Sequence, residues 1–137
     1  MSESEPQKSV DDFVAYPLHS LVAVFHGADS LKAAVHELKK NGFERDDMRS
    51  FVGQKGMQEL DFDGAAHGSA AELLRSLQHI GPDRTYLERY EGYMREGDCI
   101  LMVRAPQQER RQIAADILRE HSAHRVTYFG MLVIEEV

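Results

Sequence analysis

Two short runs of apolar residues are prominent in the pattern of hydrophobic and polar positions along the chain. The first covers residues 21–25 and the second covers residues 99–103. In each run the odd-numbered and the even-numbered positions are both apolar, whereas a strand with one face in water alternates apolar and polar residues. The pattern therefore predicts two central strands of a sheet that is covered on both faces.

A helical repeat of apolar residues follows each of these strands. The first repeat has the spacing i, i+3, i+4, i+7 and is followed by Gly42, a residue that readily adopts the left-handed conformation at which helices end. The apolar stripes are Leu31, Ala34, Val35 and Leu38 in the first helix and Ile113, Ala114, Ile117 and Leu118 in the second. Two strand–helix pairs are therefore predicted.

Two further segments predict the remaining strands. Residues 48–52 are short and flanked by charge, which suits an edge strand. Residues 126–134 predict a last strand with Gly130 as a bulge or kink inside it. The order strand–helix–strand thus occurs twice, which predicts an α+β protein (an α/β sandwich) with a ferredoxin-like βαβ-βαβ four-stranded sheet.

An inserted segment of about 53–97 separates the second and third strands. Its first part, residues 53–68, is glycine-rich and is expected to be an ordered loop. Capping and periodicity signals then predict two helices, at 69–80 and 83–97, joined by a Gly-Pro turn. We expect a helical hairpin inserted into the sheet domain.

The domain organisation follows from these elements. Residues 1–18 are polar at first and aperiodic, and we expect a mobile N-terminal tail, followed by a single domain at 19–137. The two long helices cover one face of the sheet only. We therefore expect the hairpin to cover part of the second face and a homodimer to complete its burial.

The net charge limits the kinds of partner expected, and the cysteine content indicates the cellular compartment. The formal net charge is −7, with 23 acidic and 16 basic residues, and no basic cluster is present. Nucleic acid and anionic membrane surfaces are therefore not expected as partners. The first residues lack the basic start and apolar core of a signal peptide, and the single cysteine, Cys99, fits a reducing compartment, so we expect a cytoplasmic protein. The apolar runs are far short of the ~20 residues that span a bilayer.

Three segments, at 21–53, 90–106 and 114–130, carry a resemblance to a known family. With Gly42, Tyr90, Gly97 and the Tyr128-Phe129-Gly130 ending, the chain resembles bacterial heat-induced and general stress proteins of the YflT type. The resemblance implies a bacterial, cytoplasmic, stress-related protein. It implies no catalytic residue and no cofactor.

His67 and Gly68 precede the predicted helix at 69–80. The free N–H groups of a helix start can hold an anion or a phosphate, with His67 assisting. The alternative is that these residues only lead into the Ser69 helix cap.

Tyr86, Tyr90 and Tyr93 share one face of the other predicted helix. They can line a ligand pocket or a partner surface between the sheet and the hairpin. The alternative is that they only pack this helix onto the sheet.

His121 and His124 are spaced i, i+3 near the end of the last helix, which makes them candidates for a metal pair, although no third ligand is evident. The alternative is a pair of exposed histidines at the negative end of the helix dipole. Asp61-Phe62-Asp63-Gly64 lacks the remaining ligands of a calcium loop. Cys99, in a predicted central strand, is expected to be an inert buried thiol.

These observations leave three functional hypotheses. The first is a bacterial stress-associated, non-enzymatic binding or regulatory domain that contacts a protein or a small ligand without a cofactor. The second is a small ferredoxin-like enzyme with a pocket between the sheet and the hairpin. The third is a metal-binding protein. Because ferredoxin-like sheets carry many unrelated activities, the fold alone does not choose among them.

Overall fold

The computed structural model describes residues 18–52, 64–68, 72–73, 75, 85–130 and 134–137. Its elements, in chain order, are β1 (Ser20–Phe25), α2 (Ala28–Lys40), the 3-10 helix η2 (Arg45–Asp47), β2 (Met48–Val52), β3 (Ala66–Gly68), α4 (Thr85–Arg95), β4 (Cys99–Arg104), α5 (Gln108–Glu120), β5 (Arg125–Phe129) and β6 (Ile134–Glu136). The expected tail lies outside the described residues apart from Leu18. So does most of the predicted helix at 69–80, of which Glu72, Leu73 and Arg75 are described as helical.

The strands form one sheet in the order β3-β2-β4-β1-β5-β6. Strand β1 lies at the centre and runs antiparallel to β4 on one side and to β5 on the other. Phe25 lies opposite Cys99, and Val24 lies opposite Arg125. The structure confirms the α+β class and the prediction that residues 21–25 and 99–103 are neighbouring central strands.

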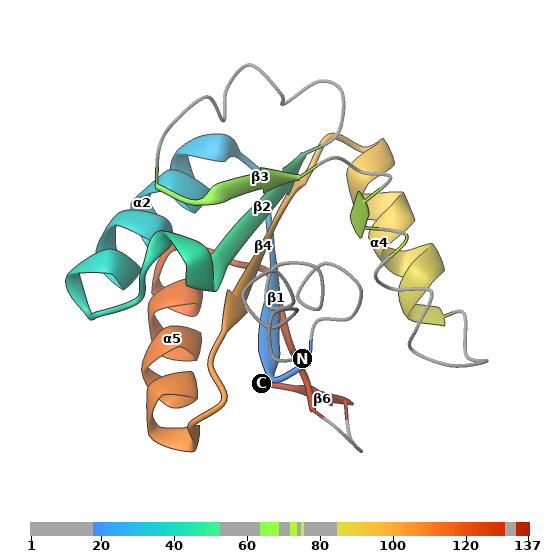
Figure 1. Cartoon of the computed structure of the whole chain (residues 1–137). Helices are drawn as coiled ribbons and strands as arrows, with labels where there is room; N and C mark the ends of the chain where they lie inside the picture. Colours follow the sequence, from blue (N-terminus) through green and yellow to red (C-terminus); the bar gives the residue numbers. More distant parts are fainter. Residues whose placement is uncertain (1–17, 53–63, 69–71, 74, 76–84, 131–133) are drawn as a thin grey trace, which may run out of the picture.

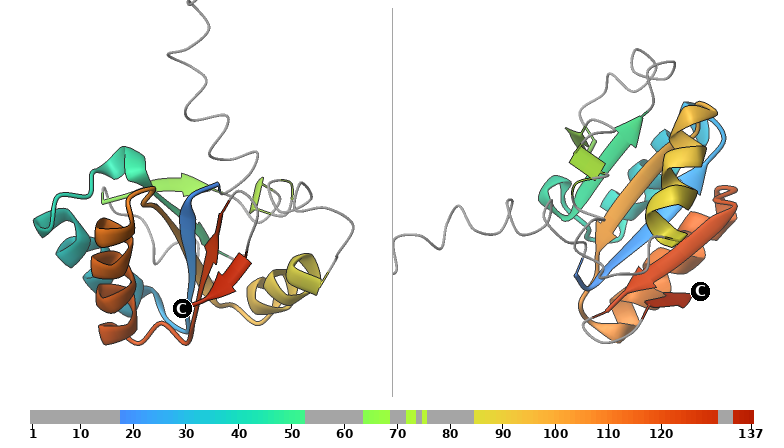
Figure 2. Two further views of the ribbon diagram at one scale, coloured as in Figure 1. Left: turned by 90° about the horizontal axis from the view of Figure 1, so that it is seen from below. Right: turned by 90° about the vertical axis from the view of Figure 1, so that its right-hand side faces the viewer.

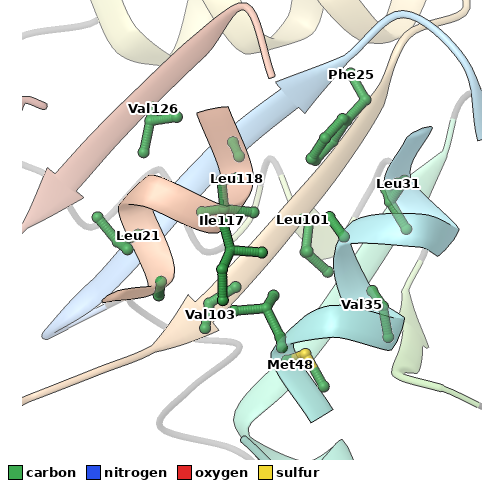
Figure 3. Packing of buried hydrophobic residues seen from close by; sticks show 14 of the residues in the cluster. Leu21, Phe25, Leu31, Val35, Met48, Leu101, Val103, Ile117, Leu118 and Val126 are labelled. Carbon is green, nitrogen blue, oxygen red and sulfur yellow. The ribbon is translucent and has the colours of Figure 1, made fainter. Parts of the chain in front are cut away.

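Helices cover both faces of this sheet. Helices α2 and α5 lie on one face and α4 lies on the other (Figures 1 and 2). Along β1, Leu21, Ala23 and Phe25 belong to the core under α2 and α5, whereas Val22 and Val24 belong to the core under α4. Figure 3 shows the first of these cores, in which side chains of β1 and β4 pack against Leu31, Val35, Ile117 and Leu118.

The second face is buried within a single chain. Val22, Val24, Ile100 and Met102 all have 0% exposure there. Burying each such side chain is worth about 1.5–3 kcal/mol, so their coverage matters for stability. The chain itself provides this coverage, so the apolar face no longer calls for a second copy.

The segment predicted as a loop contains a short strand. β3 pairs in parallel with β2, with Ser50 opposite His67. The prediction that 53–68 is all loop, and that 48–52 is an outermost strand, is therefore wrong. An added strand satisfies backbone N–H and C=O groups that an edge would leave unpaired, and a three-residue strand is too short to show a period in the sequence.

The prediction of one last strand over 126–134 is also wrong. The chain leaves β5 at Gly130 and returns as β6, which pairs antiparallel to β5 with Phe129 opposite Ile134. The Val137 N–H donates to the Val126 carbonyl at 2.9 Å. The glycine marks the end of a strand here and not a bulge within one.

The predicted end of the first helix is confirmed. Gly42 has φ +93°, and the Phe43 N–H donates to the Leu38 carbonyl at 3.1 Å. The stripe of α5 needs a correction, because Ile113 is 43% exposed and Ala115 is buried in its place. At about 100° per residue, Ile113 lies roughly 120° from the middle of the buried arc.

Candidate functional site

The strand register brings three side chains to one end of the sheet. His26 directly follows β1, Asp98 directly precedes β4, and His124 directly precedes β5. Since β4 and β5 both run antiparallel to β1, they begin where β1 ends. Asp98 and His124, which follow His26 by 72 and 98 positions in the sequence, therefore lie beside it in the fold.

Asp98 lies beside the two imidazoles and approaches one nitrogen of each. His26 Nδ1 is 3.1 Å from Asp98 Oδ1, and His124 Nε2 is 3.8 Å from Asp98 Oδ2. The two rings are stacked, with 4.2 Å between their centroids and an interplanar angle of 3°. One donor atom from each residue lies within 4.8 Å of the other two, which forms the His26–Asp98–His124 cluster.

The cluster lies at the protein surface around a buried carboxylate. The side chain of Asp98 is 9% exposed, that of His124 is 30% exposed and that of His26 is 72% exposed. Partial burial lowers the pKa of His124 below its ordinary 6.5, and His26 lowers it further, while Asp98 acts in the opposite direction. His124 is therefore neutral near pH 7, the form in which an imidazole nitrogen can bind a metal.

Backbone hydrogen bonds hold two of these residues in place. The Asp98 N–H donates to the Tyr93 carbonyl at 2.9 Å, and Gly97, in the turn that follows α4, has φ +93°. The His124 N–H donates to the Val24 carbonyl at 2.9 Å. The positions of the carboxylate and of one imidazole are thus set by helix termination and by sheet pairing.

Among the three tyrosines that were predicted to line a site, Tyr93 contacts the cluster. Its ring meets the His124 ring edge-on, with 5.2 Å between centroids and an angle of 86°. Its hydroxyl accepts a hydrogen bond from Arg125 Nε at 2.9 Å, and Arg125 Nη1 pairs with Glu136 Oε2 at 3.0 Å. Tyr93 therefore links α4 to the cluster and, through Arg125, to β6.

Tyr90 and Tyr86 contact the sheet instead. Tyr90 is fully buried in the apolar core under α4, where burial raises the pKa of its hydroxyl above the ordinary value. Tyr86 packs edge-on against Phe129, with 5.7 Å between ring centroids. Both side chains therefore pack α4 onto the sheet, with the Tyr90 hydroxyl buried and not at the rim.

His67 and Gly68 lie in β3, the outermost strand at one edge of the sheet. Their backbones pair with Ser50 and Phe51 of β2. Strands β2 and β4 separate them from β1, so they are not part of the cluster.

The two histidines of the predicted metal pair have different partners. His121 Nε2 lies 2.6 Å from Glu37 Oε1 and joins α5 to α2. His124 joins Asp98 and His26. The i, i+3 spacing did not identify the partners of His124, because His26 and Asp98 are single residues at strand ends. The signal that was available is the pairing of residues 21–25 with 99–103, which places position 26 beside position 98.

Cys99 is buried, as its place in a predicted central strand led us to expect. It lies in the core under α2 and α5. Within the part of the chain that the structure describes, no helix has the length and apolar character that crossing a membrane requires.

Comparison with known protein families, with curated proteins and with solved structures finds no match for this chain.

Proposed function

We propose that this chain is a non-enzymatic binding or regulatory domain whose ligand is a divalent transition metal, held by His26, Asp98 and His124. The observation that carries the proposal is the convergence of three donor atoms from three separate loops within 4.8 Å of one another. Three protein ligands with a fourth position left for water or another ligand form one of the arrangements in which proteins bind zinc.

The distances suit a first-row metal. Bonds of about 2.0–2.2 Å in a tetrahedral arrangement separate neighbouring ligand atoms by ~3.3 Å. The Nδ1–Oδ1 distance of 3.1 Å and the Nε2–Oδ2 distance of 3.8 Å lie on either side of this value.

The ligand types favour a particular class of metal. Imidazole nitrogen suits zinc, copper, iron and nickel, whereas magnesium and calcium prefer oxygen ligands. Two imidazoles and one carboxylate therefore favour a first-row transition metal such as Zn²⁺ or Fe²⁺, and Zn²⁺ is the probe used below. This proposal replaces the predicted pair of His121 and His124 as the basis of metal binding.

We infer a ferredoxin-like arrangement for the central part of the sheet. Four strands in the order β2-β4-β1-β5, connected as β1-α2-β2 and β4-α5-β5, support that inference. The resemblance of segments 21–53, 90–106 and 114–130 to bacterial stress proteins supports a place for this domain in a cytoplasmic stress response. The predicted homodimer loses its argument, since the side chains on both faces of the sheet are buried within one chain.

The enzyme hypothesis has less support among the described residues. Tyr90, which that hypothesis places in a pocket, is fully buried against apolar neighbours. We therefore retain metal binding and not catalysis as the function that the geometry favours.

Calorimetric titration of the untagged, chelator-treated chain with Zn²⁺ tests the proposal. We expect one Zn²⁺ per chain and no comparable binding of Mg²⁺ or Ca²⁺. Asp98→Asn and His124→Ala should each weaken Zn²⁺ binding by more than the 10–100-fold that changes in outer-shell partners cost. His121→Ala is the matched control, because it removes a nearby histidine from outside the cluster, and it should bind Zn²⁺ normally. Equal binding by Asp98→Asn, His124→Ala and the unmodified chain would falsify the proposal.

A further inference from the structure

We infer that metal binding and the docking of α4 on the sheet stabilise each other, with Tyr93 as the residue that couples them. This inference rests on the proposed metal site. It adds a regulatory property to that site: the metal controls how firmly the inserted helix is held.

Helix α4 packs on the second face of the sheet from the side opposite α2 and α5 (Figure 2). The core under it consists of Val22, Val24, Phe51, Leu73, Tyr90, Met94, Ile100, Met102 and Phe129. The Tyr90 hydroxyl is buried in this interface next to the Thr127 side chain, whose hydroxyl donates to Glu136. Attachments of α4 outside this core add to its docking on the sheet.

Tyr93 supplies such attachments and touches two of the proposed metal ligands. Its ring meets the edge of the His124 ring, and its carbonyl accepts the Asp98 N–H. Its hydroxyl also accepts from Arg125, the residue after His124. One residue of α4 therefore orients an imidazole through its side chain and a carboxylate through its backbone.

Coupling follows from these shared contacts. A metal bonded to His124 and Asp98 fixes the imidazole and the backbone that Tyr93 contacts, and this favours the docked position of α4. By linkage, docking of α4 favours the arrangement of His124 and Asp98 that binds the metal, and the factor is the same in both directions. Tyr93 is thus a positioning residue and not a ligand.

Hydrogen–deuterium exchange with and without Zn²⁺ tests the coupling in the full chain. We expect Zn²⁺ to slow the exchange of α4 amides at 85–97 by at least about fivefold, the lower end of typical coupling between sites. In Tyr93→Leu, which loses the aromatic contact with His124 but keeps the backbone hydrogen bond to Asp98, both the Zn²⁺ affinity and the added protection of α4 should fall. Tyr93→Phe keeps the ring against His124 and should retain most of both effects.

The outcomes separate this inference from the proposed function. If Zn²⁺ binds but the exchange of α4 does not change, the coupling is refuted and the metal site stands. If Tyr93→Leu binds Zn²⁺ as tightly as the unmodified chain and shows the same protection, Tyr93 is not the coupling residue and the inference is refuted. If Zn²⁺ does not bind to the unmodified chain, the proposed function itself fails and the coupling fails with it.

Discussion

The imidazole rings of His26 and His124 lie parallel, 4.2 Å apart, beside a single carboxylate. Burial lowers the pKa of His124 and the neighbouring His26 lowers it further, so the stacked arrangement favours a neutral His124 ring. A divalent cation bound by these donors would place positive charge beside the carboxylate without a proton on His124.

Acid should destabilise the metal-free protein through His124. The pKa of His124 in the folded chain lies below 6.5, so the unfolded chain binds more protons when the pH falls below about 6.5. Stability from this residue is present above pH 6.5 and decreases as the pH falls through that value. Urea unfolding of the chelator-treated, metal-free protein at pH 7.5 and pH 5.5 measures this loss of stability. In His124→Gln the difference between the two pH values should be smaller, and an unchanged difference would contradict the assignment.

Zinc should raise the thermal stability of the chain, because a ligand that binds only the folded state stabilises it. With free Zn²⁺ at a hundred times its dissociation constant, the gain is about 2.7 kcal/mol. Differential scanning calorimetry should show a higher Tm with Zn²⁺, a return to the original Tm with EDTA, and no zinc effect in Asp98→Asn. A zinc-dependent rise in Asp98→Asn equal to that of the unmodified chain would show that the metal stabilises the protein from elsewhere.

Leu101→Ala should destabilise the domain strongly. Leu101 is fully buried in β4, in the core that α2 and α5 cover (Figure 3). Removing such a side chain costs about 2–5 kcal/mol through lost burial and the cavity left behind. Ile113→Ala is the matched control, because this side chain is largely exposed on α5 and its loss should cost less than about 0.5 kcal/mol. Denaturant unfolding compares the two, and equal losses would contradict the described packing.

Two glycine-to-alanine changes should have opposite signs. Gly42 has φ +93°, and an added Cβ would lie 3.3 Å from Arg110 Nη1, so Gly42→Ala should destabilise the chain by about 1–2 kcal/mol. Gly92 lies inside α4, where an added Cβ meets nothing within 4 Å. Gly92→Ala should therefore stabilise the chain by about 0.5–1 kcal/mol through helix propensity. Chemical denaturation measures both, and a destabilising Gly92→Ala would show that α4 approaches a neighbour more closely than described.

The part of the fold that the sequence predicted is the part specified by patterns of apolar residues. Residues 21–25 and 99–103 are apolar on both faces, which only a central, covered strand requires, and β1 and β4 occupy those positions. The end of α2 followed from Gly42, because a left-handed residue has few alternatives to glycine.

The parts that were missed depend on pairing and not on pattern. The return of the chain after Gly130 and the three-residue β3 are set by which backbone groups find partners, and apolar periodicity does not record that. The cluster was missed for a related reason. His124 was identified as a candidate, but His26 and Asp98 become its neighbours only once the register of three strands is known.

Because β1 is hydrogen-bonded to a strand on each side, its register limits which sequence changes this chain can accept during evolution. A slip of β1 by one residue would turn Leu21 and Phe25 toward the opposite layer and would also carry His26 away from Asp98. Any descendant sequence that keeps its interior filled therefore inherits the alignment of the donors, even without selection on the histidines themselves. Loss of the metal site should then occur by substitution of a donor residue, while the strand register that aligns the three positions is kept.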